Sequence, residues 1–333
     1  MHKVKLKTWP HQLRSTFRKN ISKGFTLLEL LIAVAISGIV VSGLLYLVVE
    51  LLRIDNRETA LEEVQRDTRR AMNYIADDLR EAVYVYSTPT IVASTATTDV
   101  GSALPSDAIP ILAFWRIQPL SQNEMPGPCS TAYAGDANKE ERNTCETLNV
   151  RRAAYELVVY SQHAGPDAPW EGQSRISRYS LSQYTDPKNL QETPGYIDPG
   201  LQLSNFENWE RDATEILPTG GSAVLVDYID RRGTSANPVR CEDWIPGSSA
   251  GDYNLSPPDT PEDNSFFVCV RDPDAASQQD LQIARSNQDV YIFLRGDVSA
   301  RSASVNPASD VSRSPMLQTQ VLIRGVINKN PTE

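Results

Sequence analysis

Histidine is nearly absent from this 333-residue chain, which contains only His2, His11 and His163. There are four cysteines, no Cys-x-x-Cys pair and no glycine-rich phosphate-binding loop. A Ser/His/Asp or Cys/His catalytic set would therefore have to use His163, which lies in a turn-like stretch typical of a solvated loop histidine. The composition argues against an enzyme and against a zinc site.

Aspartate, glutamate, lysine, arginine and histidine are absent from Leu30 to Val49. This run matches the roughly 20 apolar residues needed to cross a bilayer core, so it predicts a transmembrane helix. One carboxylate, Glu29, lies directly before the run. A lone carboxylate at membrane depth costs on the order of 2.5–3.5 kcal/mol on insertion scales. Glu29 therefore either reaches back to the interface or has a function.

Acidic residues are absent from the first 24 positions, which carry seven of the 32 lysines and arginines. The positive-inside rule keeps such a segment in the cytoplasm and places the rest of the chain outside. Residues 25–333 contain 25 basic and 42 acidic side chains, a formal charge of −17. An acidic exported domain argues against nucleic acid or anionic lipid as a partner.

The boundary between these segments reads Gly24-Phe25-Thr26-Leu27-Leu28-Glu29. It resembles the processing site of type IV prepilins and of type II secretion pseudopilins. The resemblance implies cleavage of a basic leader, residues 1–24, between Gly24 and Phe25, and N-methylation of Phe25. It assigns Glu29 to assembly, where its carboxylate neutralises the Phe25 ammonium of the same or a neighbouring subunit. Thr26, Leu27 and Leu28 complete the assembly motif.

The resemblance extends to particular subtypes. Many major pilins carry a proline within the apolar helix, and this chain has none there. Residues 72–83 resemble the helix end of J-type pseudopilins and PilW-type minor pilins. Residues 44–52 and 83–86 are similar to the pseudopilins of cyanobacterial hormogonium polysaccharide secretion.

The helix is expected to continue beyond the apolar run. Apolar or small residues recur at steps of mostly three and four, which predicts one amphipathic stripe. The stripe comprises Ile54, Leu61, Val64, Thr68, Met72, Ile75, Leu79 and Val83. No glycine or proline interrupts residues 50–86, and Pro89 gives a stop signal. We expect a transmembrane or filament-core helix at 25–49 and an amphipathic continuation at 50–86, with the helix ending near Tyr84.

From Ser87 onward, period-two and β-rich runs replace the helical pattern, with no long helical periodicity. The predicted strands are Ile109–Gln118, Ala154–Ser161, Arg175–Leu181, Ala223–Ile229, Phe266–Arg271, Val290–Arg295 and Gln318–Ile327. The predicted fold is α+β and type IV pilin-like, with a long N-terminal helix packed on an antiparallel β-sheet head at residues 87–333. Two subdomains within the head are an alternative.

The four cysteines, Cys129, Cys145, Cys241 and Cys269, all lie in the exported part. An even number of cysteines outside the cytoplasm predicts disulfides. Among three possible connectivities we favour Cys129–Cys145 and Cys241–Cys269, because each local bridge would restrain a loop-rich stretch. A metal site is the alternative use of these thiols.

No cofactor is expected. The acidic loops at residues 252–263 and 272–280 are candidates for calcium, although neither has a recognisable ligand spacing. Trp170, Trp209 and Trp244 lie near loops, where they could contact sugar rings. Core packing or loop anchoring is the alternative role for these three side chains.

Two functions from different classes follow. The first is a minor pilin or pseudopilin that crosses the inner membrane once, with a cytoplasmic N-terminus and a periplasmic head. Its partners would be other pilins, the prepilin peptidase and an inner-membrane platform with its ATPase. It would then join a pilus-like filament that supports secretion or motility. The second is a membrane-anchored binding module that recognises a polysaccharide or a secreted protein. An anchored enzyme is a third, weaker hypothesis.

Overall fold

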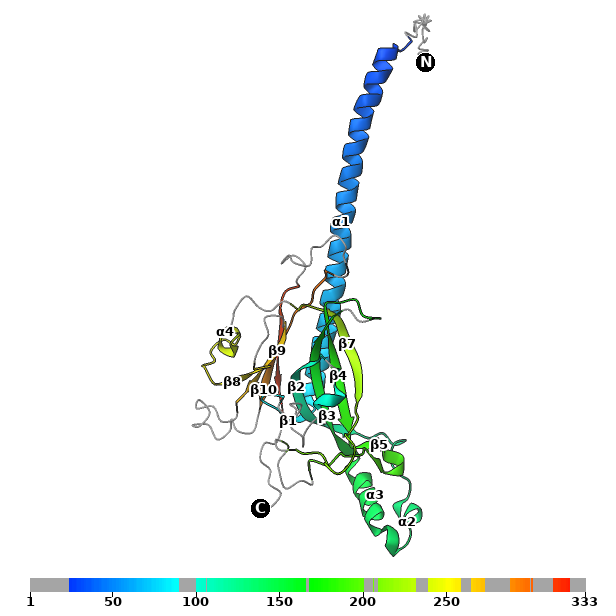
Figure 1. Cartoon of the computed structure of the whole chain (residues 1–333), viewed down its shortest axis with the longest axis vertical. Helices are drawn as coiled ribbons and strands as arrows, with labels where there is room; N and C mark the ends of the chain where they lie inside the picture. The colour runs from blue at the N-terminus through cyan, green and yellow to red at the C-terminus, as the bar shows by residue number, and fades with distance from the viewer. Residues whose placement is uncertain are drawn as a thin grey trace, which may run out of the picture. The chain divides into compact units, whose positions relative to one another are not determined.

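The computed structural model describes residues 24–89, 100–105, 107–165, 168–200, 206, 209–231, 239–258, 265–272, 288–299, 301 and 314–323. The chain forms two compact units, Met1–Ile54 and Asp55–Glu333. We call the second unit the head unit. Helix α1 (Leu27–Arg80) contributes to both units (Figure 1).

Helix α1 is a single helix of 54 residues, which confirms the expectation of one long N-terminal helix. Its predicted end was wrong, because α1 ends at Arg80 and Ala82–Val85 form strand β1. Residues 83–86 alternate valine with tyrosine, and β-branched and aromatic side chains fit a pleated surface. Pairing with strand β2 satisfies the backbone groups of β1, so the chain leaves the helix there.

The described part of the head unit contains two main antiparallel sheets (Figure 1). The larger has the order β1-β2-β3-β4-β7, with β2 (Ile109–Pro119), β3 (Ala153–Ala164), β4 (Ser174–Ser182) and β7 (Gly221–Ile229). The smaller has the order β11-β10-β9-β8, with β8 (Tyr253–Ser256), β9 (Phe266–Arg271), β10 (Asp289–Leu294) and β11 (Leu317–Leu322). A short ribbon pairs β5 (Tyr184–Asp186) with β6 (Gln191–Glu192). Each of the seven predicted strands overlaps an observed strand, and the α+β class is confirmed. Residues 324–327 of the last predicted strand lie outside the described residues.

One hydrophobic cluster joins α1 to both sheets. Ile75 and Leu79 of α1, both fully buried, share it with side chains from one face of each sheet, such as Phe114 and Ile292. The opposite face of each sheet packs in a cluster of its own. Strands buried on both faces read as continuous apolar runs, as in the Phe266–Arg271 strand. The predicted stripe is buried at Val64, Thr68, Met72, Ile75 and Leu79. Its two ends differ from the prediction, because Ile54 is 48% exposed and Val83 belongs to β1.

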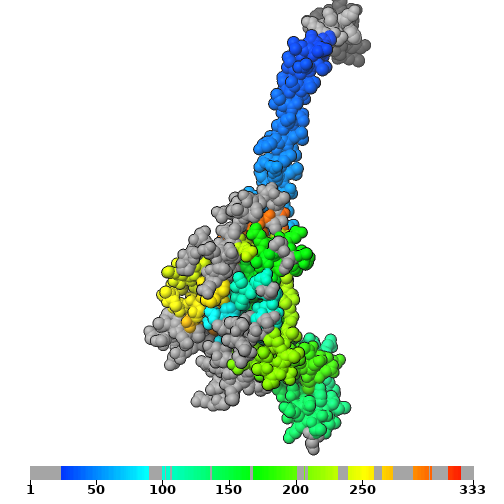
Figure 2. Space-filling view, in the orientation of Figure 1, coloured from blue at the N-terminus to red at the C-terminus, as the bar shows by residue number. Residues whose placement is uncertain are grey.

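A helical insertion separates β2 from β3. It contains α2 (Cys129–Ala132) and α3 (Lys139–Arg151), which project beyond the end of the larger sheet (Figures 1 and 2). The prediction that no long helical pattern follows Ser87 was wrong, because α3 has 13 residues. Only Cys145 and Leu148 of α3 are buried, so the helix has too few apolar positions to show a stripe.

Candidate processing and assembly site

Helix α1 begins directly after a threonine cap. The Glu29 N–H donates to Thr26 Oγ1 at 3.2 Å, and the Leu30 N–H donates to the Thr26 carbonyl at 3.2 Å. Thr26 thereby satisfies one of the helix donors that have no partner within the first turn. Thr-x-x-Glu is the spacing of a capping box, a sequence signal that was not among the predicted features. The threonine of the motif therefore fixes where α1 starts.

Glu29 lies in the first turn of α1, where the helix dipole favours a negative charge. The side chains around it are exposed, with Phe25 at 80% and Leu27 at 85%. A Cβ added to Gly24 would meet nothing within 4 Å. Packing among the described residues therefore does not require glycine at this position. Residues 1–23 of the leader lie outside the described residues.

The surface of α1 that follows is apolar and exposed. Its most hydrophobic 18-residue window has a mean hydropathy of 2.5 with no residue buried, and the helix is long and apolar enough to cross a membrane. A helix that is apolar all round needs lipid or protein around it. A shallow groove on one face is lined by Leu30, Ala33, Val34, Ser37, Gly38 and Val41. Small residues such as Ala33, Ser37 and Gly38 permit close approach of another helix.

In the head unit, Asp78 ties the last turns of α1 to the larger sheet by charge. Its carboxylate accepts hydrogen bonds from Arg116 Nη1 at 2.7 Å, Arg178 Nε at 2.7 Å and Tyr160 Oη at 2.6 Å. Glu156 of β3 accepts from Arg116 Nε at 2.6 Å and from Arg178 Nη2 at 3.3 Å. Two buried carboxylates thus face two arginines, so the charges are compensated within the fold.

The pKa values in this cluster reflect that compensation. Burial lowers the pKa of the Arg178 guanidinium, but its hydrogen bond to Asp78 and the charges of Asp78 and Glu156 outweigh burial and raise it. Burial first, and then the charge of Asp78, raises the pKa of the Tyr160 hydroxyl. The tyrosine therefore stays a neutral donor and the arginines stay charged. The cluster is a structural clamp on α1.

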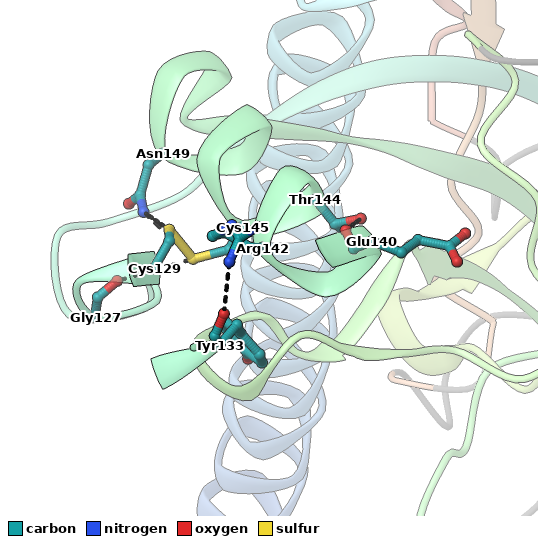
Figure 3. Close-up of a disulfide and its surroundings, with 8 residues drawn as sticks. All are labelled: Gly127, Cys129, Tyr133, Glu140, Arg142, Thr144, Cys145 and Asn149. Atoms are coloured by element: carbon teal, nitrogen blue, oxygen red, sulfur yellow. Dashed lines mark hydrogen bonds between the residues drawn. A yellow bond between two sulfur atoms is a disulfide. The ribbon is translucent and has the colours of Figure 1, made fainter. Parts of the chain in front are cut away.

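Both disulfides have the local pairing that the sequence favoured. Cys129–Cys145 joins α2 to α3, and Asn149 Nδ2 lies 3.0 Å from Cys129 Sγ (Figure 3). Cys241–Cys269 joins α4 (Cys241–Trp244) to the buried strand β9. Each bridge thus anchors a short helical segment outside the sheets. The cysteines serve as crosslinks.

Three features of the head were considered for catalysis or metal binding: a histidine, a metal site and two acidic loops. His163 is a buried residue of β3, 5% exposed, so the expectation of a solvated loop histidine was wrong. No group of three or more His, Cys, Asp or Glu side chains able to hold a metal occurs among the described residues. Most of the two acidic loops considered for calcium, namely residues 259–263 and 273–280, lies outside the described residues.

The three loop tryptophans have different environments. Trp209 is 1% exposed, and its Nε1 donates to the Ile197 carbonyl at 2.7 Å. Trp244 packs edge-on against Phe267 and Phe293. These two tryptophans have packing roles, whereas Trp170 is 36% exposed.

Comparison with known proteins agrees with the N-terminal geometry. The family described as the prokaryotic N-terminal methylation motif matches residues 19–45. No curated protein and no solved structure shows significant similarity to the chain. The match covers the capped start of α1 and most of its apolar surface. The chain therefore carries the signal of type IV pilins and pseudopilins, whose members are structural subunits.

The fold and the motif can be compared with what this class implies. The α+β fold, with a long apolar N-terminal helix and an antiparallel head, is consistent with a pilin-like fold. The motif implies assembly with other pilins and recognition by a prepilin peptidase. The apolar helix with this motif indicates a membrane-anchored protein.

Proposed function

We propose that the chain is a minor pilin or pseudopilin, processed between Gly24 and Phe25 and assembled into a pilus-like or type II secretion-like filament through α1. The observation that carries the proposal is the capped start of α1, followed directly by an exposed apolar surface. A helix built this way needs a covering partner, first lipid and then the helices of other subunits.

Glu29 has the assembly role in this proposal. Cleavage creates an ammonium at Phe25, and a carboxylate held at the third helical position can pair with the ammonium of a neighbouring subunit. Such a pair is strong within an apolar filament core, where few other partners are available. It would set the axial register of the incoming subunit, with Thr26, Leu27 and Leu28 completing the contact.

We also propose a membrane topology, assembly partners, a subtype and a place in the filament. The basic leader keeps the N-terminus cytoplasmic, and the head lies in the periplasm. The partners are other pilins and an inner-membrane platform with its ATPase. The resemblances at residues 44–52 and 72–86 favour a J- or PilW-like subunit, related to hormogonium polysaccharide secretion. A head of this size favours a low-copy place near the filament tip.

Intact-mass analysis of the protein from its native membrane tests the processing step. The expected chain begins at Phe25 with one added methyl group and lacks two hydrogens for each disulfide. A chain that retains residues 1–24 in cells with an active prepilin peptidase would contradict the proposal.

Substitution of Glu29→Ala tests the assembly step. We expect cleavage and membrane insertion to persist while incorporation into filaments falls by at least about tenfold, since a charge-assisted contact is worth roughly 1.5–3 kcal/mol. The matched control is Glu58→Ala, an exposed acid of α1 outside the motif. Normal incorporation of the Glu29→Ala chain would show that Glu29 has no assembly role.

A further inference from the structure

Two aromatic side chains of the described head unit are exposed to solvent, Tyr74 at 49% and Trp170 at 36%. Both line one groove of roughly 530 Å³ between α1 and β7. The other aromatic side chains of the described head are buried or partly buried, as their large apolar area favours. Two exposed rings that line one groove indicate a binding surface.

The loop that carries Trp170 is held firmly against β7. Asp227 Oδ2 accepts hydrogen bonds from the backbone N–H groups of Glu171 and Gly172, each at 3.0 Å. The Tyr228 hydroxyl lies 3.3 Å from Glu171 Oε2. A Cβ on Gly172 would come within 2.3 Å of Asp227 Oδ1, so only glycine allows this approach. The Trp170 ring is thus presented by a fixed loop, which lowers the entropy cost of binding.

The backbone is strained at Tyr228, which lines the same groove. Tyr228 has a φ of +61°, a left-handed conformation that is rare for a bulky residue. The Arg301 guanidinium stacks 4.3 Å from the centroid of its ring and pairs with Glu63 at 2.5 Å. Strained backbone of this kind clusters at ligand sites, and this residue lines the groove.

The polar wall of the groove has both signs of charge. Arg70 pairs with Asp67 at 3.7 Å, and its side chain is 72% exposed. The carboxylates of Asp67 and Glu171 can accept hydrogen bonds, while the guanidinium of Arg70 can donate them. The described lining has three acidic and two basic side chains, so it offers no excess of positive charge to a phosphate or sulfate group.

We propose that this groove binds a neutral oligosaccharide. A sugar ring presents an apolar C–H face, which stacks on Trp170 or Tyr74, and a rim of hydroxyl groups that both donate and accept hydrogen bonds. The carboxylates and Arg70 match that rim. The inference rests on the proposed function, which places the head outside the cytoplasm, and it names the ligand class of the head.

Titration calorimetry on the full chain in detergent tests this proposal. The probes are neutral hexasaccharides of glucose, mannose, galactose and xylose. We expect at least one to bind saturably, and Trp170→Ala or Tyr74→Ala to weaken that binding at least about tenfold, as for a central aromatic contact. Trp170→Phe should stay within about threefold of the parent, because the phenyl ring keeps a stacking surface.

Ile216→Ala is the matched control, because it truncates an exposed apolar side chain that does not line the groove. It should leave binding unchanged. Lack of binding by every probe, or undiminished binding in both alanine variants, overturns the proposal. So does a photo-crosslinker at position 170 that joins only a second copy of this chain.

This measurement is independent of processing and assembly. Failure of sugar binding in a chain that begins at Phe25 rejects the groove assignment alone. Sugar binding by a chain that is never cleaved supports the groove and rejects the proposed filament role.

Discussion

Helix α1 has two halves with the same backbone conformation and opposite surroundings. In the unit that ends at Ile54, its large apolar side chains are exposed, such as Ile39 at 74%. In the head unit, one face is buried from Ala60 to Leu79, and the other face is charged. Among the described residues, the first half therefore has no partner within its own unit, whereas the second half is part of a folded core. Secondary structure is common to both, and the side chains decide what each half contacts.

This difference separates two kinds of stability. Burial of the second half is part of the folding free energy of the head. Burial of the first half needs lipid or other subunits, so its free energy belongs to insertion and assembly. Substitutions in the two halves should accordingly change different measurements.

The largest expected effect is from Ile75→Asp, which places a carboxylate at a fully buried position of α1. An unpaired buried charge should cost more than about 4 kcal/mol, a large share of the stability of a typical domain. We expect the head to lose its cooperative melting transition, followed by tryptophan fluorescence on the full chain. Ile39→Asp is the matched change in the exposed half, and it should leave this transition in place. If Ile39→Asp melts the head, the two halves are not independent.

A second, smaller effect is expected from Asp78→Ala. This change leaves Arg116 and Arg178 without one of their two buried carboxylates. Breaking a buried ion pair from one side costs about 3–5 kcal/mol, which urea unfolding would detect. Asp77→Ala is the control, because its pair with Arg80 is exposed and should be worth at most about 1 kcal/mol. Equal losses in the two variants would mean that the clamp does not stabilise the head.

The smallest effect is expected from Gly296→Ala. A Cβ there would lie 2.4 Å from Val64 Cγ1 and 2.9 Å from Thr68 Oγ1 of α1, so overpacking should cost about 1–3 kcal/mol. Gly127→Ala, where a Cβ meets nothing within 4 Å, should be nearly neutral. Adding Val64→Ala should reduce the cost of Gly296→Ala in a double-mutant cycle. If the losses of stability from the two substitutions were strictly additive, the added Cβ at position 296 would not clash with Val64.

Much of this architecture could be predicted from local pattern. The long helix and seven strands follow from periods of 3.6 and two, because one-sided burial leaves such periods in the sequence. The helix end near Tyr84 was misplaced because Val83 continues the helical stripe, while pairing with β2 makes the segment a strand. Helix α3 has only two buried residues, too few for a period. Strand β8 is four residues long and lay in a stretch read as loop.

The two candidate sites also differ in how far the sequence alone could reveal them. The motif from Gly24 to Glu29 is contiguous, so the sequence alone identified the residues of the processing hypothesis, and the structure added the Thr26 cap. The groove combines Tyr74 of α1 with Trp170, nearly a hundred positions later. The three candidate tryptophans were equivalent in the sequence, because burial depends on which distant strands surround each ring.

The sequence by itself determined the N-terminal methylation motif and the two-part helix, because both depend on contiguous residues and on the free energy of transferring apolar side chains out of water. Only the tertiary structure decided that Asp78 joins two arginines from different strands, that His163 is buried and that Trp170 is open. Those outcomes depend on strand order and register, which bring together residues that no local pattern connects.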